Sequence, residues 1–264
     1  MAYRWVALLC IVDPAERPAF TEVMRIFFVS TFVGTFLPAS IGGDAVRAYS
    51  MARLNVRGSV AVASVFMDRM LGVASILVMA AVGLTLARDL AGNVTIILSL
   101  AVAASACVLT LILVFSEGAP PIMTTVLARM PESVRHAGDR VLESIRRYSY
   151  HHGRLTSVLV GSIVVQILRI VQAYFLGRGL AIAMPVTGYF AFIPLILLVM
   201  LLPVTINGIG TSQAAFVWFF GRAGVPAAAA FTLSVLFVGL GIVGNLPGGL
   251  LYAFGWQTGR RPAG

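Results

Sequence analysis

The sequence has no lysine, few acidic residues and only two cysteines. All 19 basic residues are arginine, against 10 aspartate and glutamate residues. Charged residues make up 11% of the chain and hydrophobic residues 59%, whereas in a soluble domain roughly a quarter of the residues are charged. This scarcity of charge excludes an ordinary soluble protein. It predicts an all-α membrane protein with roughly five to seven spans.

Cysteine and histidine are too scarce to indicate a metal site. Cys10 and Cys107 lie in separate apolar runs, without the spacing of a zinc site or a disulfide framework. His136, His151 and His152 fall together in one polar segment. We therefore expect no metal and no cofactor. The net charge of +9 does not indicate nucleic acid, because the arginines lie between hydrophobic runs, where the positive-inside rule explains them.

Hydrophobic runs predict the membrane helices, each of which needs about 20 residues to cross a bilayer. The predicted membrane segments are residues 23–37, 59–87, 93–115, 155–176, 186–202 and 225–255. The first twelve residues are apolar but too short to span, and we interpret them as the end of a truncated span. The whole chain, 1–264, is expected to form a single integral membrane domain.

The placement of arginine predicts the orientation in the membrane. Segments 39–58 and 116–153 are rich in arginine and fall on one side by span count, whereas 88–92 and 177–185 are nearly neutral. The two basic segments are therefore expected in the cytoplasm. Within 116–153, apolar residues at helical spacing over 124–148 predict an amphipathic helix on the membrane surface.

Two short segments share one pattern. LPASIGGD (37–44) and LPVTINGIG (202–210) both contain Leu-Pro, a small hydroxyl residue, Ile and then glycine. We interpret them as an internal duplication of a broken helix, and paired interruptions of this kind are the best sequence indicator of a transport site. The predicted span count makes the two copies parallel, and a change of one span would make them inverted. A further break is expected at NLPGG (245–249).

Gly42, Gly43 and Asp44 are the first candidate site residues. The glycines allow a ligand to approach the backbone closely, and Asp44 is expected to cap a helix over 45–54. A helix start at membrane depth attracts phosphate, and Arg47 would add a planar fork for phosphate oxygens. The alternative is a capped helix at the interface, with Arg47 reaching into the headgroup layer.

Asp68 and Arg69 lie inside a long apolar run, where charge is costly and usually faces a cavity or a partner. Adjacent residues point to different faces of a helix, so these two cannot simply neutralise each other. Each is expected to have its own partner, and Asp44 and Arg47 are the nearest candidates. The alternative is a helix break at Met67 that leaves the pair at the interface.

A second group of candidates lies further along the chain. Gln166 and Arg169 share a face of one predicted span and could line a cavity, or Arg169 could reach the outer headgroup layer. The second Leu-Pro motif predicts a re-entrant loop and a short helix. Its candidate residues are Asn207, Gly208, Gly210 and Gln213. No catalytic triad, paired-carboxylate site or nucleotide-binding motif is present in the sequence, so a non-enzymatic function is favoured.

Four segments together resemble the lysylphosphatidylglycerol synthase transmembrane-region family of flippase-like membrane proteins. They are LPASIGGDAVRAY (37–49), ASVFMDRMLG (63–72), LLPVTINGIGTSQAAF (201–216) and NLPGGLLY (245–252). The resemblance implies a helical bundle with re-entrant segments in a bacterial cytoplasmic membrane. It also implies transfer of a phospholipid or a lipid-linked headgroup between leaflets, and the candidate residues are expected to bind that headgroup.

The resemblance implies membrane lipids as partners, either an anionic or aminoacylated phospholipid or a polyprenyl-linked lipid. A homodimer and a separate lipid-modifying enzyme stay open as partners. The alternative function is a membrane-embedded part of an aminoacyl- or glycosyltransferase. The chain departs from the family pattern at Gln213, where glutamate is usual, and near 237–238, where an arginine is often found. A lipid with fewer ionic groups, or a loss of transport, would each fit these departures.

Overall fold

The computed structural model describes residues 2–12, 18–37, 41–54, 56–86, 98, 101–102, 104–105, 107–110, 132–201, 205 and 208–255. Over these ranges the chain is helical and contains no strand. Three helices are long and apolar enough, by length and composition, to cross a membrane. They are α4 (Gly58–Leu86), α8 (His152–Gly179) and α11 (Ala227–Gly255). The expected all-α membrane bundle is confirmed.

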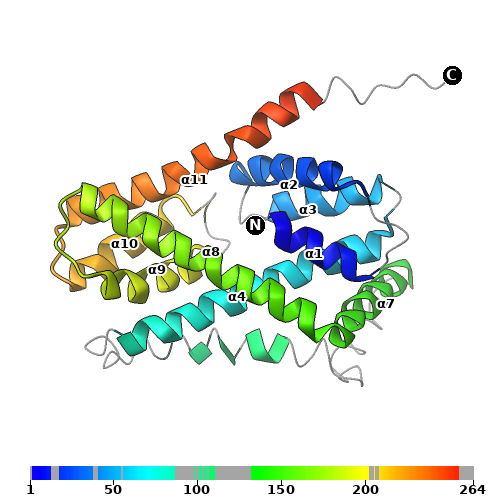
Figure 1. Cartoon of the computed structure of the whole chain (residues 1–264), viewed down its shortest axis with the longest axis horizontal. Helices are drawn as coiled ribbons and strands as arrows, with labels where there is room; N and C mark the ends of the chain where they lie inside the picture. Colours follow the sequence, from blue (N-terminus) through cyan, green and yellow to red (C-terminus); the bar gives the residue numbers. More distant parts are fainter. Residues whose placement is uncertain are drawn as a thin grey trace.

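Shorter helices pack around these long ones (Figure 1). They are α1 (Ala2–Val12), α2 (Phe20–Thr35), α3 (Ile41–Ala52), α7 (Glu132–Arg146), α9 (Val186–Met200) and α10 (Thr211–Arg222), with a 3-10 turn at Arg147–Tyr150. Helices α2 and α3 form one hairpin, and α9 and α10 form another. No arm of either hairpin exceeds 16 residues, whereas a span needs about 20. Both hairpins therefore have the length expected of re-entrant segments.

The two hairpins lie at opposite ends of the molecule, and each is followed by a helix of 29 residues (Figure 1). Helix α4 packs on α9 of the second hairpin, and α11 packs on α2 of the first. In Figure 1, α4 and α11 run in opposite directions. These two long helices are therefore antiparallel, which favours the inverted alternative over the parallel one. A common origin of the two units stays a prediction.

The start of α3 differs from the sequence prediction. The helix begins at Ile41, so Asp44 lies in its first turn and does not cap it. Gly43 lies where α3 crosses α2, because an added Cβ would come within 2.7 Å of the Ser30 carbonyl oxygen and 3.2 Å of Gly34 Cα. The absence of a side chain at this position therefore lets the two backbones pack closely.

The NLPGG segment does not break α11, which continues through Pro247. A proline inside a helix removes one backbone hydrogen bond, and the packing of this segment on α2 compensates for that loss. An added Cβ on Gly248 would collide with the Phe28 carbonyl, and one on Gly249 would lie 2.7 Å from the Phe32 ring. The glycines of this motif therefore serve helix contact, and the predicted break is wrong.

Helix α7 has its apolar side on the bundle. Ile145 and the neighbouring Tyr148 are buried in one cluster with Leu8 and Met67. Tyr148 Oη donates a hydrogen bond to the Leu8 carbonyl oxygen at 3.2 Å, and burial raises the pKa of this phenol. Over the described part of 124–148, the apolar side thus contacts the bundle, and a position at the membrane surface stays a prediction. Residues 116–131, and most of the predicted span 93–115, lie outside the described ranges.

A single cysteine at position 140 tests the predicted orientation. Arg140 is exposed on α7, and replacing Cys10 and Cys107 with alanine would leave Arg140→Cys as the sole thiol. We expect a membrane-impermeant maleimide to label it in permeabilised cells but not in intact ones, because the arginine-rich segment stays in the cytoplasm. Gly179→Cys, at the other end of α8, should label in intact cells. The reverse pattern would overturn the orientation.

Candidate functional site

A cavity of about 420 Å³ lies between the two hairpins and the long helices. Its wall contains residues of α1, α2, α3, α4, α8, α9 and α11. The charged residues of the described lining are Arg4, Asp44, Arg47, Asp68, Arg69 and Arg169. Four arginines against two aspartates leave a formal excess of two positive charges. Ionic groups gathered inside an apolar membrane bundle indicate a functional site.

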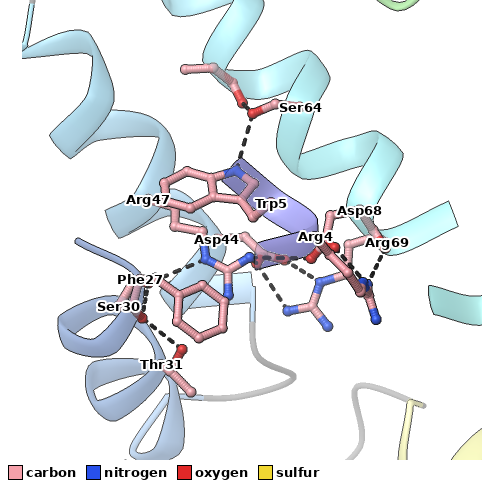
Figure 2. Close-up of polar contacts among 11 residues, drawn as sticks. Arg4, Trp5, Phe27, Ser30, Thr31, Asp44, Arg47, Ser64, Asp68 and Arg69 are labelled. Carbon is pink, nitrogen blue, oxygen red and sulfur yellow. Dashed lines mark hydrogen bonds and ion pairs between the residues drawn. The ribbon is translucent and has the colours of Figure 1, made fainter. Parts of the chain in front are cut away.

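Asp68, in the interior of α4, accepts hydrogen bonds from two arginines (Figure 2). Arg4 Nη2 donates to Oδ1 at 2.6 Å, and Arg47 Nη1 donates to Oδ2 at 3.4 Å. Arg4 also donates to the Asp68 carbonyl oxygen at 3.2 Å. All three side chains are largely buried, so each charge depends on the others in place of water.

Arg69 binds the other carboxylate of the cavity (Figure 2). Its Nε and Nη2 donate to the two carboxylate oxygens of Asp44 at 2.6 and 3.0 Å, which makes a bidentate pair. Asp68 and Arg69 therefore take different partners, as the sequence predicts. Helix α4 continues through both residues, so the alternative of a break at Met67 is wrong. The Arg69 side chain remains 37% exposed and lines the cavity.

Arg47 is engaged on several sides at the cavity wall. Its Nε donates to Ser30 Oγ at 3.3 Å, in addition to the ion pair with Asp68. Its guanidinium lies over the rings of Phe27 and Trp5, with centroid distances of 4.7 and 5.3 Å. A desolvated cation–π contact contributes about 2 kcal/mol. Arg47 is therefore buried where it ties α1, α2, α3 and α4 together.

Arg169 and Gln166, both on α8, line the same cavity. Within the described part of the chain, no hydrogen bond or ion pair engages the Arg169 guanidinium, and the charges that act on it are the cations Arg4 and Arg69. Gln166 Nε2 donates to Ser75 Oγ at 3.3 Å, whereas no donor among the described residues reaches its buried Oε1. The two residues thus share a cavity, as their spacing predicts.

The candidates of the second Leu-Pro motif that the structure describes do not belong to the cavity lining. Gly208 and Gly210 have φ values of +74° and +95°, in the left-handed region that favours glycine. Gln213 Oε1 accepts a hydrogen bond from the Gly210 amide at 2.6 Å and so caps the start of α10. Asn207 lies outside the described residues. The second hairpin contributes Leu197, Met200 and Leu201 to the lining.

Most candidate residues predicted from the first Leu-Pro motif and from α4 line the cavity. Those in the lining are Gly43, Asp44, Arg47, Asp68 and Arg69. Gly42 lies against the Leu37 side chain instead. Arg4 is not among the residues predicted from the sequence, although a lone arginine in an apolar run indicates a buried carboxylate partner. Asn245 is also absent from the predicted site residues, and its Nδ2 donates to Thr35 Oγ1 at 2.9 Å at the cavity wall.

The chemistry of the cavity suits binding of a charged group. Asp44 and Asp68 are both held in ion pairs, which makes them poor candidates for a general base. Among the residues placed by the structure, no cluster of three or more His, Cys, Asp or Glu side chains could hold a metal ion. Guanidinium groups favour phosphate or carboxylate ligands.

The family model described as "Lysylphosphatidylglycerol synthase TM region" matches residues 1–248. The matched range contains every described residue of the cavity lining, from Arg4 to Asn245. No curated protein and no solved structure matches the chain.

Proposed function

Because the chain belongs to the lysylphosphatidylglycerol synthase TM-region family, whose membrane region has a lipid-related function, we propose that it moves a phospholipid between leaflets without altering it. The membrane is expected to be a bacterial cytoplasmic membrane. The observation that carries this proposal is the charged cavity between the two hairpins and the long helices of an apolar bundle.

The cavity fits the polar part of a lipid. Its volume of about 420 Å³ lies within the range of small-molecule sites, so a headgroup can be accommodated. A phosphate must otherwise cross an apolar layer at high cost, and the cavity offers it hydrogen-bond donors on the way. The carriers of that interaction are proposed to be Arg69 and Arg169, which face the cavity, while Arg4 and Arg47 fix the wall through Asp68.

The outer surface of the same helices suits acyl chains. Exposed apolar side chains lie on α8 and α11, both of which also line the cavity. They include Val164, Leu168, Phe175, Val235, Leu240 and Val243. The acyl chains can therefore stay in the bilayer while the headgroup passes through the protein.

Reconstitution into liposomes tests the proposal. Phospholipids with a fluorescent headgroup are incorporated, and a quencher that cannot cross the membrane is added outside. We expect quenching beyond the outer-leaflet fraction, for the unaltered protein and for the surface variant Arg140→Ala, with no new lipid species by mass spectrometry. Quenching at the level of protein-free liposomes, for both anionic and zwitterionic lipids, would contradict the proposal. A modified lipid would favour the transferase alternative.

A further inference from the structure

We propose that the cavity selects lipid headgroups that carry phosphate and a net negative charge, and that it rejects aminoacylated, cationic headgroups. This inference rests on the proposed lipid movement and names the class of lipid moved. It starts from the formal excess of two positive charges in the described lining. An anionic headgroup offsets that excess, whereas a cationic one adds to it.

Both carboxylates of the described lining are already engaged by arginine. Asp68 is held by Arg4 at 2.6 Å and by Arg47 at 3.4 Å. Asp44 accepts both arms of the Arg69 fork. An aminoacyl ammonium group is neutralised only by an anionic partner, and to obtain either carboxylate it would have to displace an arginine and leave that arginine buried without its partner.

Arg169 supplies the second observation. No carboxylate of the described chain pairs with it, and its electrostatic neighbours, Arg4 and Arg69, repel it. A cation at membrane depth normally has a partner. A phosphate group in the cavity would give Arg169 a charge-assisted hydrogen bond and would reduce the repulsion from Arg69.

Two further side-chain acceptors of the described residues, on Gln213 and Gln166, are neutral amides. Gln213 uses its side-chain oxygen to cap α10. In the described lining, the buried acceptor without a donor is Gln166 Oε1. An amide oxygen can accept a hydrogen bond from an ammonium group, but it does not offset the positive charge. The wall therefore carries the charge pattern of an anion site.

Liposomes of neutral bulk lipid test the selectivity. They carry trace lipids labelled on an acyl chain, so that the headgroup stays native. The headgroups are an anionic glycerol phosphate, a zwitterionic ethanolamine phosphate and a cationic lysyl ester of glycerol phosphate. A labelled polyprenyl phosphate is included to show whether the anionic lipid that moves is a glycerophospholipid or a polyprenyl-linked lipid. We expect at least one anionic lipid to move about tenfold or more faster than the cationic lipid, because like charges in the cavity oppose entry.

The variant Arg169→Gln is expected to reduce the advantage of the anionic lipid about tenfold, and Arg178→Gln, exposed on the same helix, should not change it. A cationic lipid that moves as fast as the anionic ones would overturn the charge selection and leave lipid movement standing. If none of the lipids moves, both proposals fail. Should Arg169→Gln not fold, the ranking of lipids by the unaltered protein decides alone.

Discussion

Asp68→Asn should lower the free energy of unfolding by roughly 3–5 kcal/mol, the usual cost of breaking a buried ion pair. The carboxylate accepts from Arg4 and Arg47 at once, and an amide can neither neutralise them nor accept as strongly. Thermal unfolding of the purified protein in detergent measures the effect. Asp139→Asn, on the exposed side of α7, is the matched control and should leave the unfolding temperature unchanged.

A double variant separates lost charge from lost packing. If the loss of the Asp68 charge opposite the two arginines causes the destabilisation, Arg4→Met in the Asp68→Asn background should recover part of the stability, because one buried cation is removed. Equal unfolding temperatures for Asp68→Asn and the unaltered protein would show that the Arg4–Asp68–Arg47 network does not hold the bundle together.

Arg69→Ala should slow lipid movement roughly 10- to 100-fold, because a hydrogen bond to a charged group contributes about 1.5–3 kcal/mol. The fold should be retained, since Asp44 keeps Arg47 within 4.0 Å and the Arg69 side chain is 37% exposed. Arg69→Lys, which keeps the charge but loses the planar fork, should give an intermediate rate. The rate is measured in liposomes, next to thermal unfolding of each variant.

The matched control is Arg140→Ala, which removes an exposed arginine far from the cavity lining. It should move lipid at the rate of the unaltered protein. Full activity in both Arg69→Ala and Arg47→Ala would place the lipid path elsewhere.

Local sequence patterns predict many of the helices and several contacts of the charged residues. The apolar runs predict the bounds of α4, α8 and α9 closely, because a helix in a bilayer needs a continuous apolar run. Separate partners for Asp68 and Arg69 are predicted correctly, because adjacent side chains on a helix point to different faces. The two Leu-Pro motifs predict the hairpins because proline and glycine disfavour a continuous helix.

Other features depend on packing between distant segments. The NLPGG motif contains helix-breaking residues, and yet α11 stays intact because Gly248 contacts α2. Arg4 is separated from Asp68 by 64 residues, so no local pattern joins them. The direction of the second unit depends on the number of spans before it, and one miscounted span turns a parallel arrangement into an inverted one.

Photo-cross-linking with a headgroup-labelled lipid tests most directly whether the headgroup enters the cavity. An anionic phospholipid with a diazirine on its headgroup is placed in nanodiscs with the protein, irradiated, and the adducts are mapped by mass spectrometry. We predict headgroup adducts on the cavity residues Val73, Ile76 and Gln172, and acyl-chain adducts, from a tail-labelled lipid, on the exposed Leu168 and Val243. Headgroup adducts confined to α7 and the helix ends, with none in the cavity, would contradict the proposed path.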